Sequence, residues 1–317
     1  MEISLPVTLA VLGAALLHAS WNALLKASAD KALDTVAIST GAGLVGLAVA
    51  PWLAAPAPES WPWLAASAAV HILYFLFLAG AYRWGELSFT YPIMRGGGPV
   101  MVAVVGFFVF GEIFSQLQAL GIALVCAGIV GFAAGRANPR ALAFALANSA
   151  VIAAYTLIDA KGARASGSPV AYAMWFFFAN GVVIYAVSGA RRGMQVPCYL
   201  ARHGWRIAAG ALCTTGAYGI ALWAMTLAPV ALVAVLRETS VLFAAALGAL
   251  FLGERFTRRR ALATGAVLAG LIALRLYNYC SCRLPLTKRT RSPERQFGGE
   301  SVVTMRSEPF SMRTATS

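Results

Sequence analysis

The sequence predicts an all-α integral membrane protein in which ten transmembrane helices form two inverted five-helix repeats. Three observations lead to this prediction: the chain is unusually apolar, its apolar residues fall into ten long runs, and its second half repeats the first. Of the 317 residues, 60% are hydrophobic and only 12% are charged, whereas soluble domains are about 25% charged. A mean hydropathy of +0.73 also excludes disordered and collagen-like chains. We therefore expect a multi-pass protein of the cell membrane.

Each of the ten runs has about 20 residues, which as a helix is enough to cross roughly 30 Å of hydrocarbon. The breaks between runs fall at charged residues, glycine and proline, and the short loops leave no room for a soluble catalytic domain. The first run lacks the basic start of a signal peptide and is expected to remain as a helix. The expected spans are residues 6–26, 35–54, 62–82, 90–110, 116–135, 141–161, 170–189, 206–226, 230–252 and 259–276.

An internal repeat organises these runs. When residues 91–132 are shifted by 142 they lie on residues 233–274, and eleven of the 42 positions are identical, including Arg95 with Arg237. Two halves of five helices follow, and because five is odd, the second half enters the membrane in the opposite direction. Inverted repeats are typical of secondary transporters, whose substrate site lies at the repeat interface near the bilayer midplane.

The repeated turn Gly111-Glu112-x-Phe114 and Gly253-Glu254-x-Phe256, together with the opening helix around 18–26, resembles the EamA-type carriers of the drug/metabolite transporter superfamily. The resemblance covers about residues 5–276. It implies a carrier that moves a small metabolite by alternating access, with no covalent chemistry. The expected units are a first repeat at 1–138, a second repeat at 139–276 and a basic, disordered tail at 277–317.

The net charge of +13 does not indicate nucleic-acid binding, because most Lys and Arg residues lie in loops or in the tail. Such charges face anionic lipid headgroups in membrane proteins. Their distribution over the short loops predicts both termini outside the cell, whereas the resemblance implies cytoplasmic termini. The five cysteines show no metal-ligand spacing, and no cofactor is expected. Nothing in the pattern requires an oligomer.

Arg95 and Arg237 are the strongest candidates for a substrate site. A charge at the centre of a membrane helix costs roughly 2.5–3.5 kcal/mol on insertion scales, so a repeated pair indicates a cavity that uses both. The structural alternative is that Arg237 pairs with Glu238 or another acid, and that Arg95 binds carbonyls or snorkels. The segment Gly96–Pro99 predicts a helix break that would expose backbone N–H groups beside Arg95. Simple close packing of a kinked helix is the alternative there.

Polar and aromatic side chains that share helix faces complete the expected cavity wall. His18 or Asp159 could couple protons to transport, although Asp159 could also form a loop pair with Lys161 or Arg164. Glu112 is expected to cap the following helix or to accept from nearby donors. The candidate substrate-binding residues are Arg95, Arg237, Glu238, His18, Trp21, Asn22, Tyr155, Asp159, Tyr74 and Tyr218.

Two rival classes remain besides a carrier. An integral-membrane enzyme would need a catalytic motif, and the chain contains neither H-E-x-x-H nor G-x-S-x-G. A membrane partner or sensor without transport activity is the second alternative. The match to G-x-G-x-x-G at 41–46 lies inside an apolar run, so we interpret it as close helix packing rather than dinucleotide binding. The same interpretation applies to Gly121, Gly128 and Gly135.

Overall fold

A computed structural model describes residues 3–26, 28–85, 87–131, 133, 138–251 and 258–283. The described part of the chain is helical, without β-strands. Its α-helices are α1 Leu5–Lys26, α2 Lys31–Val49, α3 Trp61–Trp84, α4 Leu87–Phe110, α5 Gln116–Gly131, α6 Pro139–Ala165, α7 Pro169–Arg192, α8 Gln195–Arg202, α9 Gly204–Leu227, α10 Val230–Arg237, α11 Ser240–Phe251 and α12 Arg258–Arg283, with short 3₁₀ turns at Ala50–Trp52 and Pro58–Ser60.

Seven described segments are long and apolar enough to cross a membrane, and they correspond to the first four and the sixth to eighth expected spans. The chain is therefore a multi-pass membrane protein. The apolar helices Gln116–Gly131 and Ala261–Leu274 are shorter. The run expected at 230–252 is divided between α10 and α11. The count of ten spans stays a prediction.

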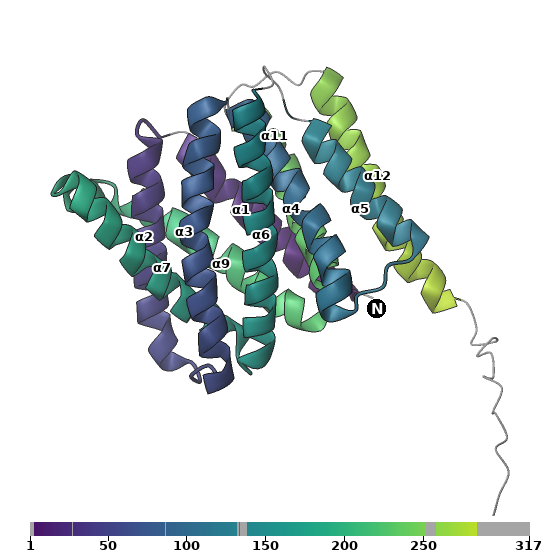
Figure 1. Cartoon of the computed structure of the whole chain (residues 1–317), viewed down its shortest axis with the longest axis horizontal. Helices are drawn as coiled ribbons and strands as arrows, with labels where there is room; N and C mark the ends of the chain where they lie inside the picture. The colour runs from purple at the N-terminus through teal and green to yellow at the C-terminus, as the bar shows by residue number, and fades with distance from the viewer. Residues whose placement is uncertain are drawn as a thin grey trace, which may run out of the picture.

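The helices pack side by side, with one helix pair on each flank of the bundle (Figure 1). Helix α2 packs against α7 on one flank, and α5 packs against α12 on the other. Between the flanks, α3 and α4 pack on α6, while α9, α10 and α11 pack on α1. Helices α4 and α10 also meet at the centre.

Glycines allow the flanking helices to approach until their backbones touch. A Cβ added at Gly121 would lie 2.9 Å from the Gly270 carbonyl oxygen, and one at Gly128 would lie 2.8 Å from that of Ala263. On the other flank, a Cβ at Gly43 would lie 2.9 Å from the Gly181 Cα. The packing interpretation of the G-x-G-x-x-G match, and of Gly121 and Gly128, is confirmed. Gly135 lies outside the described residues.

The expected helix break at Gly96–Pro99 is wrong, because α4 continues through it with both Pro92 and Pro99 inside. Side chains of neighbouring helices fill the space that its glycines leave. A Cβ on Gly96 would lie 2.9 Å from Val130 Cγ2, and one on Gly97 would lie 2.6 Å from Ser149 Oγ. These glycines therefore serve close packing, and the discontinuous helix lies in the second half of the chain.

Of the two roles expected for Glu112, the structure confirms the second: its carboxylate accepts from nearby donors and does not cap α5. A capping box of Ser115 and Gln118 covers that helix start, with Ser115 N donating to Gln118 Oε1 at 3.0 Å and Gln118 N to Ser115 Oγ at 3.2 Å. Glu112 is instead buried and accepts from the backbone N–H groups of Val230 and Ala231 at 2.5 and 3.3 Å. It thus caps α10, which belongs to the other half. Its counterpart Glu254 lies outside the described residues.

Two boundaries also differ from the expectation. Helix α12 continues to Arg283, beyond the expected end at 276, and the remainder of the tail lies outside the described residues. The loop between α7 and α9 contains the short helix α8. This helix has only eight residues and no apolar run of membrane length, so the sequence did not predict it.

Gly270→Ala tests the α5–α12 contact. The added Cβ would lie 2.7 Å from the Gly121 carbonyl oxygen, and such overpacking costs about 1–3 kcal/mol of unfolding free energy. Gly265→Ala is the matched control, because its Cβ would meet nothing within 4 Å. We expect thermal unfolding in detergent to shift downward only for the first variant. Equal midpoints for the two variants would contradict the contact.

Candidate functional site

The interruption between α10 and α11 determines where the charges of the second half lie. Helix α10 ends at Arg237, and Glu238 N and Thr239 N donate to Val235 O and Leu236 O at 3.1 and 3.2 Å. These three-residue turns replace the four-residue pattern of an α-helix. The hydroxyl of Thr239 also donates to Leu236 O. The turn therefore uses its own polar groups while the side chains of Arg237 and Glu238 point elsewhere.

Glu238 forms an ion pair with Arg95, which comes from the other half of the chain. The Arg95 Nε and Glu238 Oε2 atoms are 2.9 Å apart, and the side chains are 11% and 7% exposed. The Arg95 Nη2 atom is buried and has no hydrogen-bond partner among the residues that the structure describes. One end of the guanidinium is thus paired, while the other retains unused donors.

Arg237 has no ion pair in the described part of the chain. Its guanidinium carbon lies 5.3 Å from the centre of the Tyr218 ring, a distance at which a cation is attracted by the aromatic face. The internal repeat explains the missing acid. Under the shift of 142, Glu238 lies on Gly96, so an acid that could pair with Arg237 in the equivalent way is missing.

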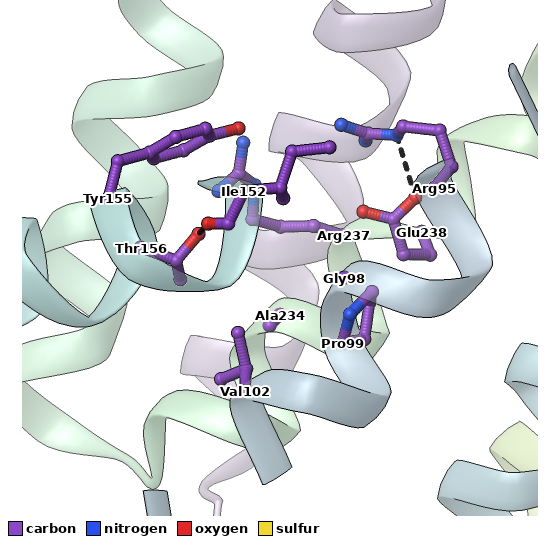
Figure 2. Close-up of a pocket in the computed structure, with 10 residues that line it drawn as sticks. All are labelled: Arg95, Gly98, Pro99, Val102, Ile152, Tyr155, Thr156, Ala234, Arg237 and Glu238. Atoms are coloured by element: carbon purple, nitrogen blue, oxygen red, sulfur yellow. Dashed lines mark hydrogen bonds and ion pairs between the residues drawn. The ribbon is translucent and has the colours of Figure 1, made fainter. Parts of the chain in front are cut away.

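Both arginines line one narrow pocket at the contact of α4, α6 and α10, with Arg95, Arg237 and Tyr155 extending toward one another (Figure 2). The space inside has room for about one water molecule. Its charged side chains are two cations and one anion. The lining residues are Arg95, Gly98, Pro99, Val102, Ile152, Tyr155, Thr156, Ala234, Arg237 and Glu238.

A second polar cluster surrounds Asp159, which is fully buried in α6. Tyr172 Oη donates to Asp159 Oδ1 at 2.9 Å, and Tyr218 Oη donates to Oδ2. The alternative of a loop pair with Lys161 or Arg164 is wrong. Arg164 donates to the Met225 and Ala228 carbonyls, and the Lys161 amine lies 5.3 Å from the Trp63 ring centre.

Tyr218 connects the two clusters, since its hydroxyl binds Asp159 while its ring faces Arg237. The rings of His71 and Tyr155 lie 4.3 Å apart beside them. Tyr74 packs on Tyr155, with ring centres 6.0 Å apart. The two clusters therefore form one continuous polar and aromatic centre, to which helices α3, α4, α6, α7, α9 and α10 contribute.

The α1 residues bind mainly to one another. Trp21 Nε1 donates to His18 Nδ1 at 3.3 Å, and Asn22 Nδ2 donates to the His18 carbonyl oxygen at 2.7 Å. His18 does not line the pocket. All three side chains are half-buried.

Comparison with known proteins adds the family. Residues 140–276 match the model of the EamA-like transporter family. The match covers most of the second half of this chain. A stretch of 72 residues is 35% identical to the multidrug resistance protein EbrB of Bacillus subtilis (strain 168), and equally to EbrB of Bacillus atrophaeus. That match covers 23% of this chain and 61% of each relative, so the chain spans less than two thirds of these curated relatives.

One crystal structure of a protein superposes on this chain with a TM-score of 0.66 and 18% sequence identity. The alignment covers 87% of this chain and 98% of that one. At this identity the likeness shows the fold alone. Together, the family match and the EbrB relatives support a transporter of the drug/metabolite type and point away from an enzyme.

Sequence reasoning missed Tyr172 of α7, whose hydroxyl donates to Asp159. The signal in the sequence is Gly162, which has no side chain: an added Cβ would lie 2.5 Å from the Tyr172 hydroxyl. A glycine one turn after a membrane aspartate leaves room for such a partner.

Glu238→Gln tests the buried ion pair. Removing one partner of a buried pair costs about 3–5 kcal/mol, because the remaining charge is left uncompensated. We expect the variant to lose that much unfolding free energy in detergent denaturation. Arg237→Gln is the control, since its cation has no paired acid among the described residues. Equal loss in both variants would contradict the pairing.

Proposed function

We propose that this protein is a secondary transporter that moves a small anionic or zwitterionic metabolite by alternating access. The observation that carries the proposal is a pocket in the membrane bundle that two repeat-related arginines line, together with one glutamate, which pairs with Arg95. The substrate's anionic group binds Arg237 and the unused donors of Arg95. This site also includes Glu238, Tyr155 and, through the adjoining cluster, Tyr218 and Asp159.

Two inverted halves of five helices underlie this mechanism. In the repeat, α1 corresponds to α6 and α3 corresponds to α9. The packing of α3 on α6 therefore has an equivalent in the packing of α9 on α1, and both contacts are present. The contacts between α5 and α12 show the same equivalence. Under the shift of 142, Gly121 corresponds to Ala263 and Gly128 to Gly270, and the structure contains both the contact of Gly121 with Gly270 and that of Gly128 with Ala263. This equivalence supports ten spans, with α10 and α11 counted as one interrupted helix.

Charge balance supports an anionic group. The pocket lining has two arginines and one glutamate, so it carries an excess positive charge when empty. A carboxylate or phosphate-like group would offer charge-assisted, bidentate hydrogen bonds to a guanidinium. A zwitterion could in addition direct its ammonium group toward Glu238. A purely cationic ligand would add to the existing excess.

The remaining predicted site residues, His18, Trp21, Asn22 and Tyr74, would form the outer wall. We propose that they meet the substrate when the bundle opens, since a pocket with room for about one water molecule must widen before a metabolite enters. Alternating access provides such widening from each side in turn. A lipid bilayer is the only other partner that this mechanism needs, and no oligomer is required.

Asp159 is the proposed site for a coupling proton, ahead of His18. It is a fully buried carboxylate that accepts hydrogen bonds from the phenols of Tyr172 and Tyr218. One of those phenols also faces Arg237. Protonation of Asp159 would change the Tyr218 hydrogen bond, and through that ring it would change the position of the substrate-binding cation.

The names of the EbrB relatives suggest a second candidate, export of drugs. A membrane sensor or partner without transport remains the alternative from another class. Flux in proteoliposomes separates the sensor from both transporters. The charge of the ligand separates the metabolite carrier from a drug exporter that takes cations.

A thermal-shift panel of carboxylates, phosphate esters, zwitterionic amino acids and organic cations tests the substrate class. We expect an anionic or zwitterionic compound to stabilise the purified protein and to be transported in proteoliposomes. For that compound, Arg237→Gln should weaken binding at least tenfold, the effect of losing about 1.4 kcal/mol. Arg95→Gln should weaken it too, and the double variant should abolish it.

Arg192→Gln is the matched control, because this arginine makes a surface ion pair at 3.5 Å with side-chain exposures of 39% and 45%. Its affinity should match the wild type. The substrate class is wrong if the identified ligand is a cation, or if both pocket variants keep full affinity.

Asp159→Asn tests proton coupling once a substrate is known. The wild type should transport faster under an imposed pH gradient, whereas the asparagine variant should bind the substrate and ignore the gradient. Tyr172→Phe keeps the carboxylate and should retain the response. Coupling at Asp159 would be refuted by a gradient response that survives in Asp159→Asn, and coupling itself by a wild type that never responds.

A further inference from the structure

A polar cluster around the buried carboxylate of Asp34 lies at one end of the bundle, outside the proposed substrate site. It consists of Asp34 in the first turn of α2, Tyr199 in α8 and Arg206 near the start of α9, and we refer to these three residues as the latch. Arg206 Nη2 donates to Asp34 Oδ2 at 3.1 Å, and Tyr199 Oη donates to Asp34 Oδ1 at 2.8 Å. Arg206 also donates to the Leu24 carbonyl oxygen at 3.0 Å.

The latch joins the two halves of the chain at the end where α1 finishes and α2 and α9 begin. At the opposite end, Glu112 of the first half holds the start of α10 in the second. The pocket lies between these two ties and has almost no free space. The latch ties the end of α1 and the start of α2 to the start of α9, so α1 and α9 can part at this end only if these contacts break.

The position of Arg206 is unfavourable for the helix that carries it. It is the third residue of α9, and a cation in the first turn opposes the helix dipole. Asp34 has the reverse placement, since an acid in the first turn of α2 is favoured. The contact across the halves therefore explains Arg206 better than the stability of α9 does.

The groups in the latch suit a contact that opens and closes. A carboxylate, a guanidinium and a phenol regain hydrogen bonds from water when they separate, whereas a parted glycine-packed interface does not. Asp34 is 1% exposed, but the Arg206 side chain is 23% exposed, so water already reaches one partner. The glycine contacts of α2 with α7 and of α5 with α12 would stay closed during such a motion.

We propose that Asp34, Tyr199 and Arg206 form a gate that closes one side of the central pocket and separates in the state open to that side. Its purpose rests on the alternating access proposed above. Its test reads pocket accessibility and needs no substrate. A failed substrate search would therefore leave the gate testable, and a failed gate would leave the arginine site intact.

The reporter for the test is Thr156→Cys, a pocket-lining position, in the full-length chain with its five native cysteines replaced by serine. A membrane-impermeant maleimide is applied from each side of oriented membranes. A parallel protein that keeps only Cys198, which is exposed in α8, identifies the side on which the latch lies. We expect Arg206→Gln to accelerate labelling from that side about tenfold, a shift typical of coupled equilibria.

Arg192→Gln is again the matched control, since it removes a nearby exposed pair with Asp30, and it should leave the labelling rate unchanged. Tyr199→Phe keeps the ring that stacks on His203 at 4.1 Å and should accelerate labelling by a smaller factor. This milder variant also guards against misfolding of Arg206→Gln. Unchanged labelling in both latch variants, equal acceleration in the control, or acceleration only from the opposite side would overturn the proposal.

Discussion

The pairing of Arg95 with Glu238 is the interaction on which the centre of this bundle depends. A charge inside a membrane bundle is tolerated where it is paired, hydrated or bound to a ligand. Here the two partners come from different halves of the chain, so their 2.9 Å contact holds α4 against the end of α10. The interruption after Arg237 makes this possible, because its tight turn directs Glu238 toward α4 while Arg237 faces Tyr218.

The two halves of the chain differ in charge at the centre of the bundle. A duplicated chain with an acid at both equivalent positions would have formed two ion pairs and left no cation available. Instead, Gly96 stands where the first half would carry the acid, and it serves the packing of α4 on α5. The glycine at this position thus allows close helix packing, and Arg237 has no paired acid in the part of the chain that the structure describes.

Much of this arrangement could be predicted from the sequence. The length of the apolar runs predicted the seven membrane-length segments that the structure describes. The internal repeat predicted that Arg95 and Arg237 lie close together, and both line one pocket. The helix break was assigned to the wrong half, because glycine and proline weaken an isolated helix, whereas inside a bundle neighbouring side chains support it. In the second half, where neither residue occurs near the break, no local signal marks it. The partner of Glu112 lies 118 residues away and could not be read from local spacing.

The same physics divides the bundle into parts that stay together and parts that can move. Flanking helices meet through backbone contacts at glycines such as Gly43 and Gly121, and dispersion forces of this kind fall steeply with separation. The ends meet through charged and hydroxyl groups, which exchange one another for water at a small net cost. A motion that keeps the flanks closed and opens one end is therefore the cheapest way to widen the centre. Because Arg95 and Glu238 lie where the halves meet, any such motion alters their contact, and a substrate anion that competes for Arg95 would favour the same change. In the proposed mechanism, binding of the substrate and opening of the bundle are therefore linked through the ion pair of Arg95 and Glu238.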